Sequence, residues 1–584
     1  MRKIFFDCEV YVNYFLALFK TNDGRKFKVS MHDDVRDADL KALRSVLKNE
    51  LVSFNGNHYD LWVIGGFLAG YSNEQLKRLS DDIILKDMRP WELSDAHPMI
   101  SIPPTNHIDL VGVTPLHASL KVYGCRIHAP KLQDLPIEPS SRIDSEQAAL
   151  LERYCENDVD VTAQIYQTLL PQIELREAMS SEYGVDLRSK SDAQIAEEIL
   201  RVKLKERGVE VRKRSTEVKP FAYVPPDWVR FDSPDLQKVL MRVKDARFSV
   251  NEKGSVVLPD GVGSEILFAG RTYKLGIGGL HSQEKQQVIV SDERKFFGEL
   301  DVASFYPSII LGQSLFPEHL TERFCEIYRE IFDTRISAKH SGDKVTADTL
   351  KIVLNGSYGK FGSKYSFLFS PELLIQTTMT GQLSLLMLIE QLVDVGAIVT
   401  SANTDGVNVV FAKHLAPKVK EVKLNWEKTT GFSLEWTPYS ATFSESVNSY
   451  VAIKPDGSTK TKGLFEAGSI RKGYSAQICN EAIRRHLVDG VAIEQTIDDA
   501  QDMEDFLIMR GVKGGAVWRD EALGKVVRWF ISTEGEPIRY ASNGNKVAGS
   551  DGAYPMMDMA PIPDHLDRAS YVEMAKRKLK RLGL

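Results

Sequence analysis

The stretch FFGELDVASFYPSIIL, residues 296–311, decides how the second half of the chain is interpreted. Its beginning is typical of a buried strand, Asp301 stands where that strand would end, and Pro307 favours the start of a helix soon afterwards. A carboxylate at the end of a hydrophobic strand is well placed to hold a metal ion. We therefore expect a strand that delivers Asp301 to a metal site.

A second acid is expected beside the first. In GAIVTSANTDGVNVVF, residues 396–411, two β-rich runs flank an Asn-Thr-Asp-Gly sequence, and an Asp-Gly pair favours a tight hairpin turn. Asp405 then lies at the hairpin tip. Together with Asp301 it would supply the pair of carboxylates that bridges two metals in nucleotidyl transfer.

Between these two acids the sequence predicts a basic helical hairpin. Lys351, Asn355 and Tyr358 are spaced i, i+4 and i+7 on one helix face, and Arg335 and Lys339 are one turn apart upstream. The letters HSGD between the two helices indicate a turn. Binding of a triphosphate needs such a cluster of cations. A solvated helix face would explain the charges, but not the asparagine and tyrosine in register with them.

The first part of the chain carries four further acids. Asp7 and Glu9 are two apart on a predicted strand, so both carboxylates project from one face and repel each other unless a cation lies between them. Asp60 follows a strand-like run at the start of a helix, and Asp158 falls on the apolar stripe of a long helix, where an unpaired carboxylate is costly. Each acid alone would be interpreted as solvated surface.

Composition limits the class of protein. A chain of 584 residues exceeds one compact core, and a net charge of -6 argues against wholesale attraction to nucleic acid but not against a locally basic groove. The five cysteines form no CxxC pair, so neither a disulfide framework nor a zinc or iron–sulfur module is indicated. Asp7 and Glu9 are incompatible with a signal peptide, and no apolar run suffices to span a bilayer. We expect a cytoplasmic monomer without membrane contact.

Taken together, these segments resemble the family B DNA polymerases that carry a 3′–5′ proofreading exonuclease. The order D-x-E, N-x3-Y-D, Y-x3-D resembles the three exonuclease motifs, and D-x2-S-F-Y-P-S-I-I, K-x3-N-G-x-Y-G and T-D-G resemble polymerase motifs A, B and C. The resemblance covers nearly the whole chain. It implies an α/β multidomain fold, in which a ribonuclease-H-like exonuclease domain precedes a right-hand polymerase of palm, fingers and thumb.

The resemblance also implies how the chain is divided. The exonuclease would occupy 1–175, and a connector with the N-terminal part of the palm would occupy 176–290. The rest would consist of palm in 291–320, fingers as a helical hairpin in 321–361, palm in 362–470, and thumb with the C-terminal region in 471–584.

In the exonuclease, the resemblance implies two divalent metals, Mg²⁺ or Mn²⁺, held by Asp7, Glu9, Asp60 and Asp158. Tyr154 would orient the attacking water, and Asn55 and Tyr59 would hold the single-stranded 3′ end. For Lys121 and Lys131 we favour a solvated surface position over a phosphate contact.

In the polymerase, two further metals would be held by the carboxylates of Asp301 and Asp405 and the backbone of Val302. The contacts to the incoming dNTP would come from Arg335, Lys339, Lys351, Asn355, Tyr306 and Tyr358. Tyr306 would stack under the sugar and exclude a ribose 2′-hydroxyl, although a plain core position would also explain this aromatic. The DNA contacts would come from Tyr273, Gly278 and Gly279 on the template side and from Tyr450, Lys460 and Lys462 on the primer side.

The sequence departs from the family pattern at two places. Relatives usually read D-T-D-S at motif C, whereas this chain has Asn403 and Gly406. We interpret Asn403 as a tolerated turn residue that can still hold a metal-bound water, so that metal affinity falls somewhat while turnover survives. Relatives often have K-x-Y where this chain has Asn448, and Lys460 and Lys462 are the expected substitutes in gripping the primer.

The expected activity is DNA-templated DNA synthesis on an ordinary primer, by an enzyme of phage or plasmid type, with primer-template DNA, dNTPs and replication accessory proteins as partners. The gaps from 301 to 351 and from 351 to 405 leave little room for the insertions of protein-primed relatives, which remain the alternative. Two different classes of protein also fit parts of the sequence: a primer-template binding protein whose polymerase site has decayed, and an enzyme that only degrades DNA. The retained carboxylates oppose the first, and the basic hairpin opposes the second.

Overall fold

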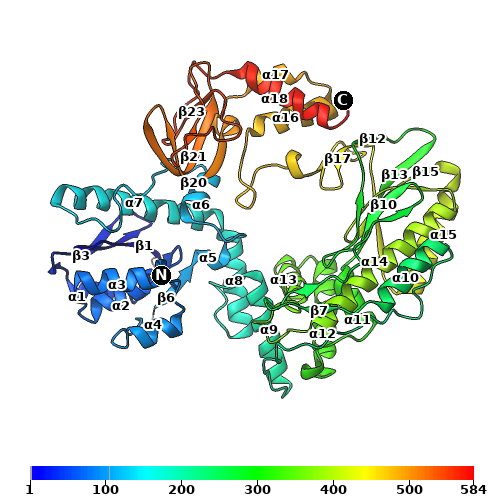
Figure 1. The fold of residues 1–584 in the computed structure, drawn as a ribbon, viewed down its shortest axis with the longest axis horizontal. Coiled ribbons are helices and arrows are strands. Elements are labelled where there is room, and N and C mark those ends of the chain that lie inside the picture. The colour runs from blue at the N-terminus through cyan, green and yellow to red at the C-terminus, as the bar shows by residue number, and fades with distance from the viewer. Residues whose placement is uncertain (1–2, 104) are drawn as a thin grey trace. The chain divides into compact units, whose positions relative to one another are not determined.

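The computed structural model describes residues 3–103 and 105–584, which form two compact units (Figure 1). The first unit contains the described residues up to Ser191 together with 467–481 and 494–573, and the second contains 192–466, 482–493 and 574–584. Each unit is thus built from separate segments of the chain. Helices that cross these boundaries are α16 (Gln477–Asp489), α17 (Ile493–Asp499) and α18 (Arg568–Arg581).

A six-stranded sheet forms the centre of the first unit. Its strands are β1 (Lys3–Val10), β2 (Tyr14–Thr21), β3 (Lys26–His32), β4 (Val35–Asp37), β5 (Glu50–Ser53) and β6 (Asn106–Asp109). The order is β4-β3-β2-β1-β5-β6, in which β1 to β4 form an antiparallel meander and β5 is parallel to both β1 and β6. The carboxyl ends of β1, β5 and β6 therefore lie at the same edge of the sheet.

Helices cover both faces of this sheet. Successive side chains of β1 point to opposite faces, so they pack with different helices. Phe5 packs with α7 (Ser145–Thr168), whereas Phe6 and Cys8 pack with α2 (Asp60–Leu68) and α3 (Asn73–Ile84). Figure 1 shows α7 on one side of the strands and α2 and α3 on the other. The smaller helices are α1 (Leu40–Val46), α4 (Pro90–Ala96), α5 (Leu110–Val113), α6 (Leu120–Arg126) and α8 (Leu170–Tyr183).

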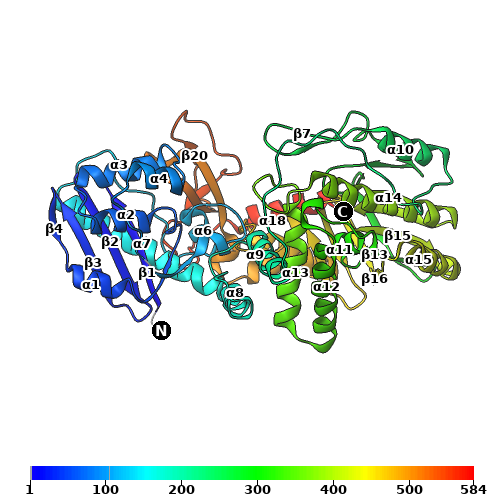
Figure 2. The ribbon, with the colours of Figure 1, turned by 90° about the horizontal axis from the view of Figure 1, so that it is seen from below.

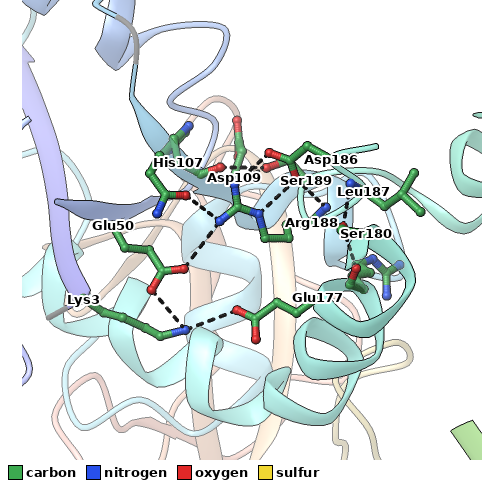
Figure 3. A network of polar contacts seen from close by, with 12 residues as sticks. Lys3, Glu50, His107, Asp109, Glu177, Ser180, Asp186, Leu187, Arg188 and Ser189 are labelled. Carbon is green, nitrogen blue, oxygen red and sulfur yellow. Dashed lines mark hydrogen bonds and ion pairs between the residues drawn. The ribbon is translucent and has the colours of Figure 1, made fainter. Parts of the chain in front are cut away.

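A polar network closes the first unit beside β5 and β6 (Figure 3). The guanidinium of Arg188 donates to Asn106 Oδ1 at 2.5 Å and to Asp186 Oδ2 at 2.7 Å. Lys3 lies 3.5 Å from the carboxylates of both Glu50 and Glu177. The network connects three strands of the sheet, β1, β5 and β6, to α8 and to the loop that follows it.

A second sheet of the first unit comes from the C-terminal part of the chain. It has the order β22-β20-β21-β23, from β20 (Ile508–Trp518), β21 (Glu521–Ile531), β22 (Arg539–Tyr540) and β23 (Ala553–Pro555). Arg528 on β21 is fully buried and donates to the carbonyls of Met556 at 2.8 Å, Ala129 at 2.9 Å and Met557 at 3.0 Å. The N–H of Leu132 also donates to the Met557 carbonyl at 2.9 Å. These bonds join residues far apart in sequence.

The resemblance implies a thumb with the C-terminal region over 471–584. Within that range, 494–573 belongs to the same compact unit as the first sheet. The reason is the set of backbone partners of Arg528 near Ala129, a pairing over a sequence distance that no local pattern reveals.

In the second unit, a seven-stranded sheet carries the order β16-β13-β15-β14-β11-β10-β9, and all of its neighbours pair antiparallel. The strands are β9 (Ile266–Phe268), β10 (Arg271–Lys274), β11 (His281–Gln283), β13 (Lys295–Val302), β14 (Ile398–Asn403), β15 (Gly406–Ala412) and β16 (Leu434–Pro438). A smaller sheet contains β12 (Gln287–Val290), β17 (Ala441–Ser446), β18 (Ser449–Ile453) and β19 (Thr459–Lys462). A two-stranded ribbon contains β7 (Ser249–Val250) and β8 (Val256–Val257).

The two faces of β13 meet different partners. Leu300 and Val302 pack into the main core with α14 (Pro371–Asp394) and α15 (Ala416–Thr430), while Phe297 packs with Tyr439 next to the smaller sheet. By the alternation of a strand, Glu299 and Asp301 share the side of Phe297. Two short helices complete this region, α10 (Pro234–Asp245) and α11 (Phe305–Gly312).

Helix α14 has the length and apolar composition that a membrane span requires, which the sequence interpretation did not expect. Of its most apolar window, 83% is buried inside the protein, and its side chains form part of the main core. Helix α14 is therefore a core helix of the second unit.

Two antiparallel helices, α12 (Arg323–Ser341) and α13 (Lys344–Lys360), run side by side (Figure 2). Gly342 ends α12 with a positive φ of 80°, and the side chain of Asp343 accepts the Thr346 N–H at the start of α13. Helix α9 (Asp192–Glu206) also packs on α13. A Cβ at Gly356 would lie 2.8 Å from Ala196 Cβ, so this close approach requires glycine.

Candidate active sites

Four acids meet at one edge of the first sheet. Asp7 and Glu9 project from β1 on the side of α7, which contributes Asp158, and Asp60 is the first residue of α2. All four line a cavity of about 430 Å³. The family resemblance implied that these acids form one cluster, and the structure brings them together.

Burial and mutual repulsion make this cluster unfavourable without a cation. Burial is the largest cause that raises the pKa of each of the four carboxyl groups, and it raises the pKa of Asp60 to about 7. The Oδ1 atom of Asp60 is buried and has no hydrogen-bond partner among the described residues. Carboxylate oxygens are the preferred ligands of Mg²⁺ and Mn²⁺, so the donor set fits divalent metals.

Lys121 corrects one expectation. It was expected to be a solvated surface lysine, but its ammonium group contacts the Asp158 carboxylate and lies 4.3 Å from the ring centroid of Tyr154. Its side chain is 20% exposed. The sequence did not reveal this contact because Lys121 is on α6, far from α7 along the chain. Lys131, by contrast, is exposed as expected.

Asn55 and Tyr59 also line the cavity. The hydroxyl of Tyr59 is 2.9 Å from Ser80 Oγ, which fixes the ring at the wall. Tyr154 is placed one helical turn before Asp158 on α7, next to Lys121.

Asp109 holds the loop that presents Asn55, a role that the sequence analysis missed. Its carboxylate accepts the N–H groups of Asn55 at 2.8 Å and Asn57 at 3.0 Å, and its own N–H donates to Ser189 Oγ at 2.8 Å (Figure 3). Asn55 has a positive φ of 74°. The sequence signal that could have identified Asp109 is its place at the end of β6. Because β6 is parallel to β5, both strands end at the same edge of the sheet, where Asn55 follows β5.

The second cluster lies on β13 and the β14–β15 hairpin. Asp301 is directly opposite Gly406 of β15, and the Val302 N–H donates to the Asp405 carbonyl at 2.8 Å. Burial, followed by the charges of Asp405 and Glu299, raises the pKa of Asp301 to about 7. Burial also raises the pKa of Asp405. These two carboxyl groups are therefore a second candidate metal site.

The hairpin turn corrects the sequence interpretation of Asn403. Asp-Gly was expected to form the turn, but Thr404 and Asp405 occupy it, with a positive φ of 58° at Thr404. Asn403 is the last residue of β14, paired with Gly406 and with His281 of β11. It is a strand residue, so its tolerance does not derive from turn dihedrals.

Gly406 leaves space for Asp301. A Cβ at this position would lie 2.9 Å from Asp301 Oδ1. Such a contact is closer than a side chain normally makes, so Asp301 would have to move.

Glu299 is a further acid that the sequence analysis missed. It shares the side of Asp301 on β13, and its Oε2 accepts the Tyr439 hydroxyl at 2.6 Å and the Lys460 ammonium at 2.7 Å. Lys460 was expected to grip the primer, but it is engaged by Glu299. Lys462 of β19 stands opposite Tyr450 of β18 in the smaller sheet, and Tyr450 is partly buried.

The basic hairpin approaches the second cluster at several points. Arg335 donates to Ser304 Oγ at 2.8 Å. Lys339 Nζ is 3.8 Å from the carboxylate of Glu435, a residue of β16 that stands opposite Asp301 of β13. The rings of Tyr306 and Tyr358 stack with centroids 4.1 Å apart. Lys351 and Asn355 are exposed on α13.

The proposed template loop is only partly at the surface. Tyr273 is 1% exposed within the main core, so we correct its assignment from a DNA contact to a core residue. The carbonyl of Gly278 accepts the Tyr306 hydroxyl at 2.6 Å. Gly279 has a φ of 152°, and a Cβ there would be 3.1 Å from Thr404 Cα. The loop thus supports the hairpin tip.

The two departures from the family pattern contact each other. Asn403 Nδ2 donates to Asn448 Oδ1 at 3.3 Å. A neutral amide pair therefore occupies both positions.

No protein-family model and no curated protein matches the sequence. Among solved structures, the chain is similar to the family B DNA polymerase from the hyperthermophilic archaeon Pyrobaculum calidifontis. The match has a TM-score of 0.41 and 14% sequence identity, and it covers 100% of this chain and 78% of that chain.

Proposed function

We propose that the protein is a DNA-templated DNA polymerase of family B type with a proofreading 3′–5′ exonuclease. The observation that carries this proposal is the presence of two separate carboxylate clusters, each with raised pKa values, one in each compact unit. The cluster around Asp301 lies beside cationic helices and stacked tyrosines, whereas the cluster around Asp7 lines a cavity of about 430 Å³.

In the proposed polymerase site, Asp301, Asp405 and the Val302 carbonyl would hold two Mg²⁺ ions, which activate the primer 3′-hydroxyl and stabilise the charge on the triphosphate. Arg335 and Lys339 would bind the triphosphate oxygens. Lys339 would exchange its exposed contact with Glu435 for a phosphate, and Lys351 and Asn355 would add contacts from α13.

The stacked tyrosines would form the floor of the nucleotide site. Tyr306 is fixed from two directions, by the ring of Tyr358 and by the Gly278 carbonyl. A ring held in this way can support a deoxyribose and leave no space for a 2′-hydroxyl.

In the proposed exonuclease site, the four acids would hold two divalent ions that supply a nucleophilic hydroxide and stabilise the leaving oxygen. Asn55 and Tyr59 would hold the unpaired 3′ end against the cavity wall. Lys121 would keep Asp158 and Tyr154 in position, and Tyr154 would orient the attacking water.

The retained second cluster favours synthesis over a decayed polymerase site. The charges of Asp405 and Glu299 raise the pKa of Asp301 more than Lys460, the cation paired with Glu299, lowers it, so the acids destabilise the protein unless a further cation binds there. We further propose an ordinary nucleic-acid primer and a phage or plasmid source, because the segments between the three polymerase motifs are short.

The test is extension and digestion of a 5′-labelled primer on a longer template with Mg²⁺. Wild type should lengthen the primer with the four dNTPs and shorten it without them. Asp405→Ala should only shorten the primer, and Asp7→Ala should only lengthen it. Asp394→Ala, which removes an exposed acid at the end of α14, is the matched control and should behave as wild type. Digestion by wild type under every condition would overturn the synthetic activity.

A further inference from the structure

An aromatic pocket of about 280 Å³ lies in the second unit, between α15 and the strands β13, β15 and β16. Three rings form part of its wall: the ring centroid of Phe411 is 5.8 Å from that of Phe296 and 5.9 Å from that of Trp436. Phe296 is 41% exposed and Trp436 is 37% exposed, although both are large apolar residues. Two rings of the pocket are therefore open to the solvent.

The aromatic pocket lies on the face of β13 that the proposed metal site does not use. Successive side chains of a strand point to opposite faces, so Phe296 and Gly298 share one face of β13, and Asp301 is on the other. A Cβ at Gly298 would lie 2.6 Å from Cζ2 of Trp436, so the glycine allows the indole to lie against the strand backbone.

Lysines accompany the aromatic rings. Lys420 and Lys423 line the pocket, and Lys413 Nζ is 5.2 Å from the ring centroid of Phe296. Residues 413–428 contain five lysines and two glutamates, of which Glu427 is 3.6 Å from Lys423. Lys420 is exposed. The rim of the pocket is therefore locally positive, although the whole chain has a net charge of -6.

This combination restricts the class of ligand. The apolar wall favours a bulky apolar group, because its entry removes apolar surface from water, and the lysines favour anionic groups beside it and repel cations. A nucleic-acid base stacks on the face of an exposed ring and does not fill a hollow, whereas one aromatic or large aliphatic side chain can enter it. A single anchor side chain surrounded by charged contacts is typical of protein–protein interfaces.

We propose that the aromatic pocket is a docking site for an acidic segment of a partner protein. The segment places one aromatic or large aliphatic side chain between the rings of Phe296, Phe411 and Trp436, and its carboxylates pair with Lys413 and Lys420. Because Asp301 is on the opposite face of β13, the docking does not depend on the proposed synthesis of DNA.

The experiment measures the fluorescence anisotropy of a labelled peptide in the presence of the full chain. The peptide contains one phenylalanine and one leucine, with glutamates on both sides. Wild type should bind it with a Kd below about 100 µM. Lys420→Glu should weaken the binding by at least about tenfold, and Ala416→Trp, which places an indole in the pocket, should abolish it. Lys418→Glu is the matched control, because Lys418 is exposed on the same helix but does not line the pocket, and it should retain the wild-type affinity.

Two further peptides separate the apolar from the charged contribution. One has serines in place of the phenylalanine and leucine, the other has lysines in place of the glutamates, and neither should bind. The absence of binding to wild type would overturn the proposal, and so would equal affinities of wild type and Lys420→Glu. Since Lys420 is exposed, that variant keeps the test decisive even if Ala416→Trp does not fold.

Two other occupants of the pocket are distinguished in parallel. Dimerisation in sedimentation that Ala416→Trp abolishes would assign the pocket to a second copy of the chain. A labelled single-stranded oligonucleotide that loses affinity in Lys420→Glu and Ala416→Trp, but not in Lys418→Glu, would assign it to nucleic acid. Either result would overturn the proposal.

Discussion

Asn403 lies in a row of paired residues that crosses strands β14, β15 and β13 of the seven-stranded sheet and ends at Asp301 of the second cluster. Its neighbours in that row are Gly406 and, beyond it, Asp301, while its amide bonds to Asn448. In the resembled family an acid is usual at the first position and a lysine is frequent at the second. In this chain both positions are asparagine, and the contact between their side chains is uncharged.

A double-mutant cycle tests this interpretation. Asn403→Asp should destabilise the protein by about 1 kcal/mol, because a carboxylate oxygen then faces the Val447 carbonyl, to which Asn403 Nδ2 now donates at 3.5 Å. Combined with Asn448→Lys, the loss should be recovered through an ion pair. The measurement is the free energy of unfolding of the four proteins, together with the Mg²⁺ concentration for half-maximal extension. Additive effects would show that the two positions are not coupled.

Gly406→Ala tests whether the space beside Asp301 matters. The added Cβ would meet Asp301 Oδ1 at 2.9 Å and displace a proposed metal ligand. We expect primer extension to fall on the order of 10²-fold, as misplacement of a reacting group by about 1 Å can do, while digestion is unchanged. The control is Gly511→Ala. Gly511 lies in β20, and no described atom is within 4 Å of a Cβ added there. Equal extension by both variants would contradict the prediction.

Among elements, the packing of α9 on α13 determines where the basic hairpin stands. Gly356 allows the approach, because a Cβ there would be 2.8 Å from Ala196 Cβ and 2.9 Å from the Asp192 carbonyl. Lys360 strengthens the contact with an ion pair of 3.1 Å to Glu197. The side chains of α13 that we propose for nucleotide binding depend on this support.

Two glycine substitutions in the same helix should have opposite effects on stability. Gly359 has no described atom within 4 Å of an added Cβ, so Gly359→Ala should stabilise the protein by up to about 1 kcal/mol through helix propensity. Gly356→Ala gains the same propensity but should destabilise the protein by about 1–2 kcal/mol net, because of the clash with α9. Denaturant unfolding measures both. Stabilisation by both variants would show that α9 can move away from the added Cβ at Gly356 without a loss of stability.

Sequence patterns predict the features of helices, strands and turns that depend on residues close together in the sequence. The glycine and aspartate of HSGD mark the turn between α12 and α13, and the strand before Asp301 follows from its apolar run. Contacts between distant segments leave no such pattern. The burial of Tyr273, the contact of Lys121 with Asp158, and the engagement of Lys460 by Glu299 each depend on a partner elsewhere in the fold.

At the scale of the whole molecule, the two acid clusters should make stability depend on pH and on metal. The folded-state pKa values of Asp60 and Asp301 are raised to about 7, above the value of about 4 in an unfolded chain. Their contribution to stability is therefore complete below about pH 4 and is lost as the pH rises through about 7. A bound divalent cation removes the loss, because it favours the ionised carboxylates.

The prediction is that, in EDTA, wild type loses more stability between pH 5.5 and pH 8 than Asp60→Asn does, by an amount on the order of a few kcal/mol. Mg²⁺ should raise the thermal midpoint of wild type more at pH 8 than at pH 5.5. Asp95→Asn, which changes an exposed acid on α4, should keep the wild-type dependence. An identical pH dependence of wild type and Asp60→Asn would refute the assignment.

The buried guanidinium of Arg528 has a practical consequence for dissecting the protein. Its hydrogen bonds reach back to Ala129, and the chain passes from one compact unit to the other after residues 191, 466, 481, 493 and 573. No single cut can then release an intact half: a fragment that stops at Ser191 would leave the backbone around Ala129 and Leu132 without its partners. To study one of the two proposed activities in isolation, the other must be silenced by point substitution within the undivided 584-residue chain.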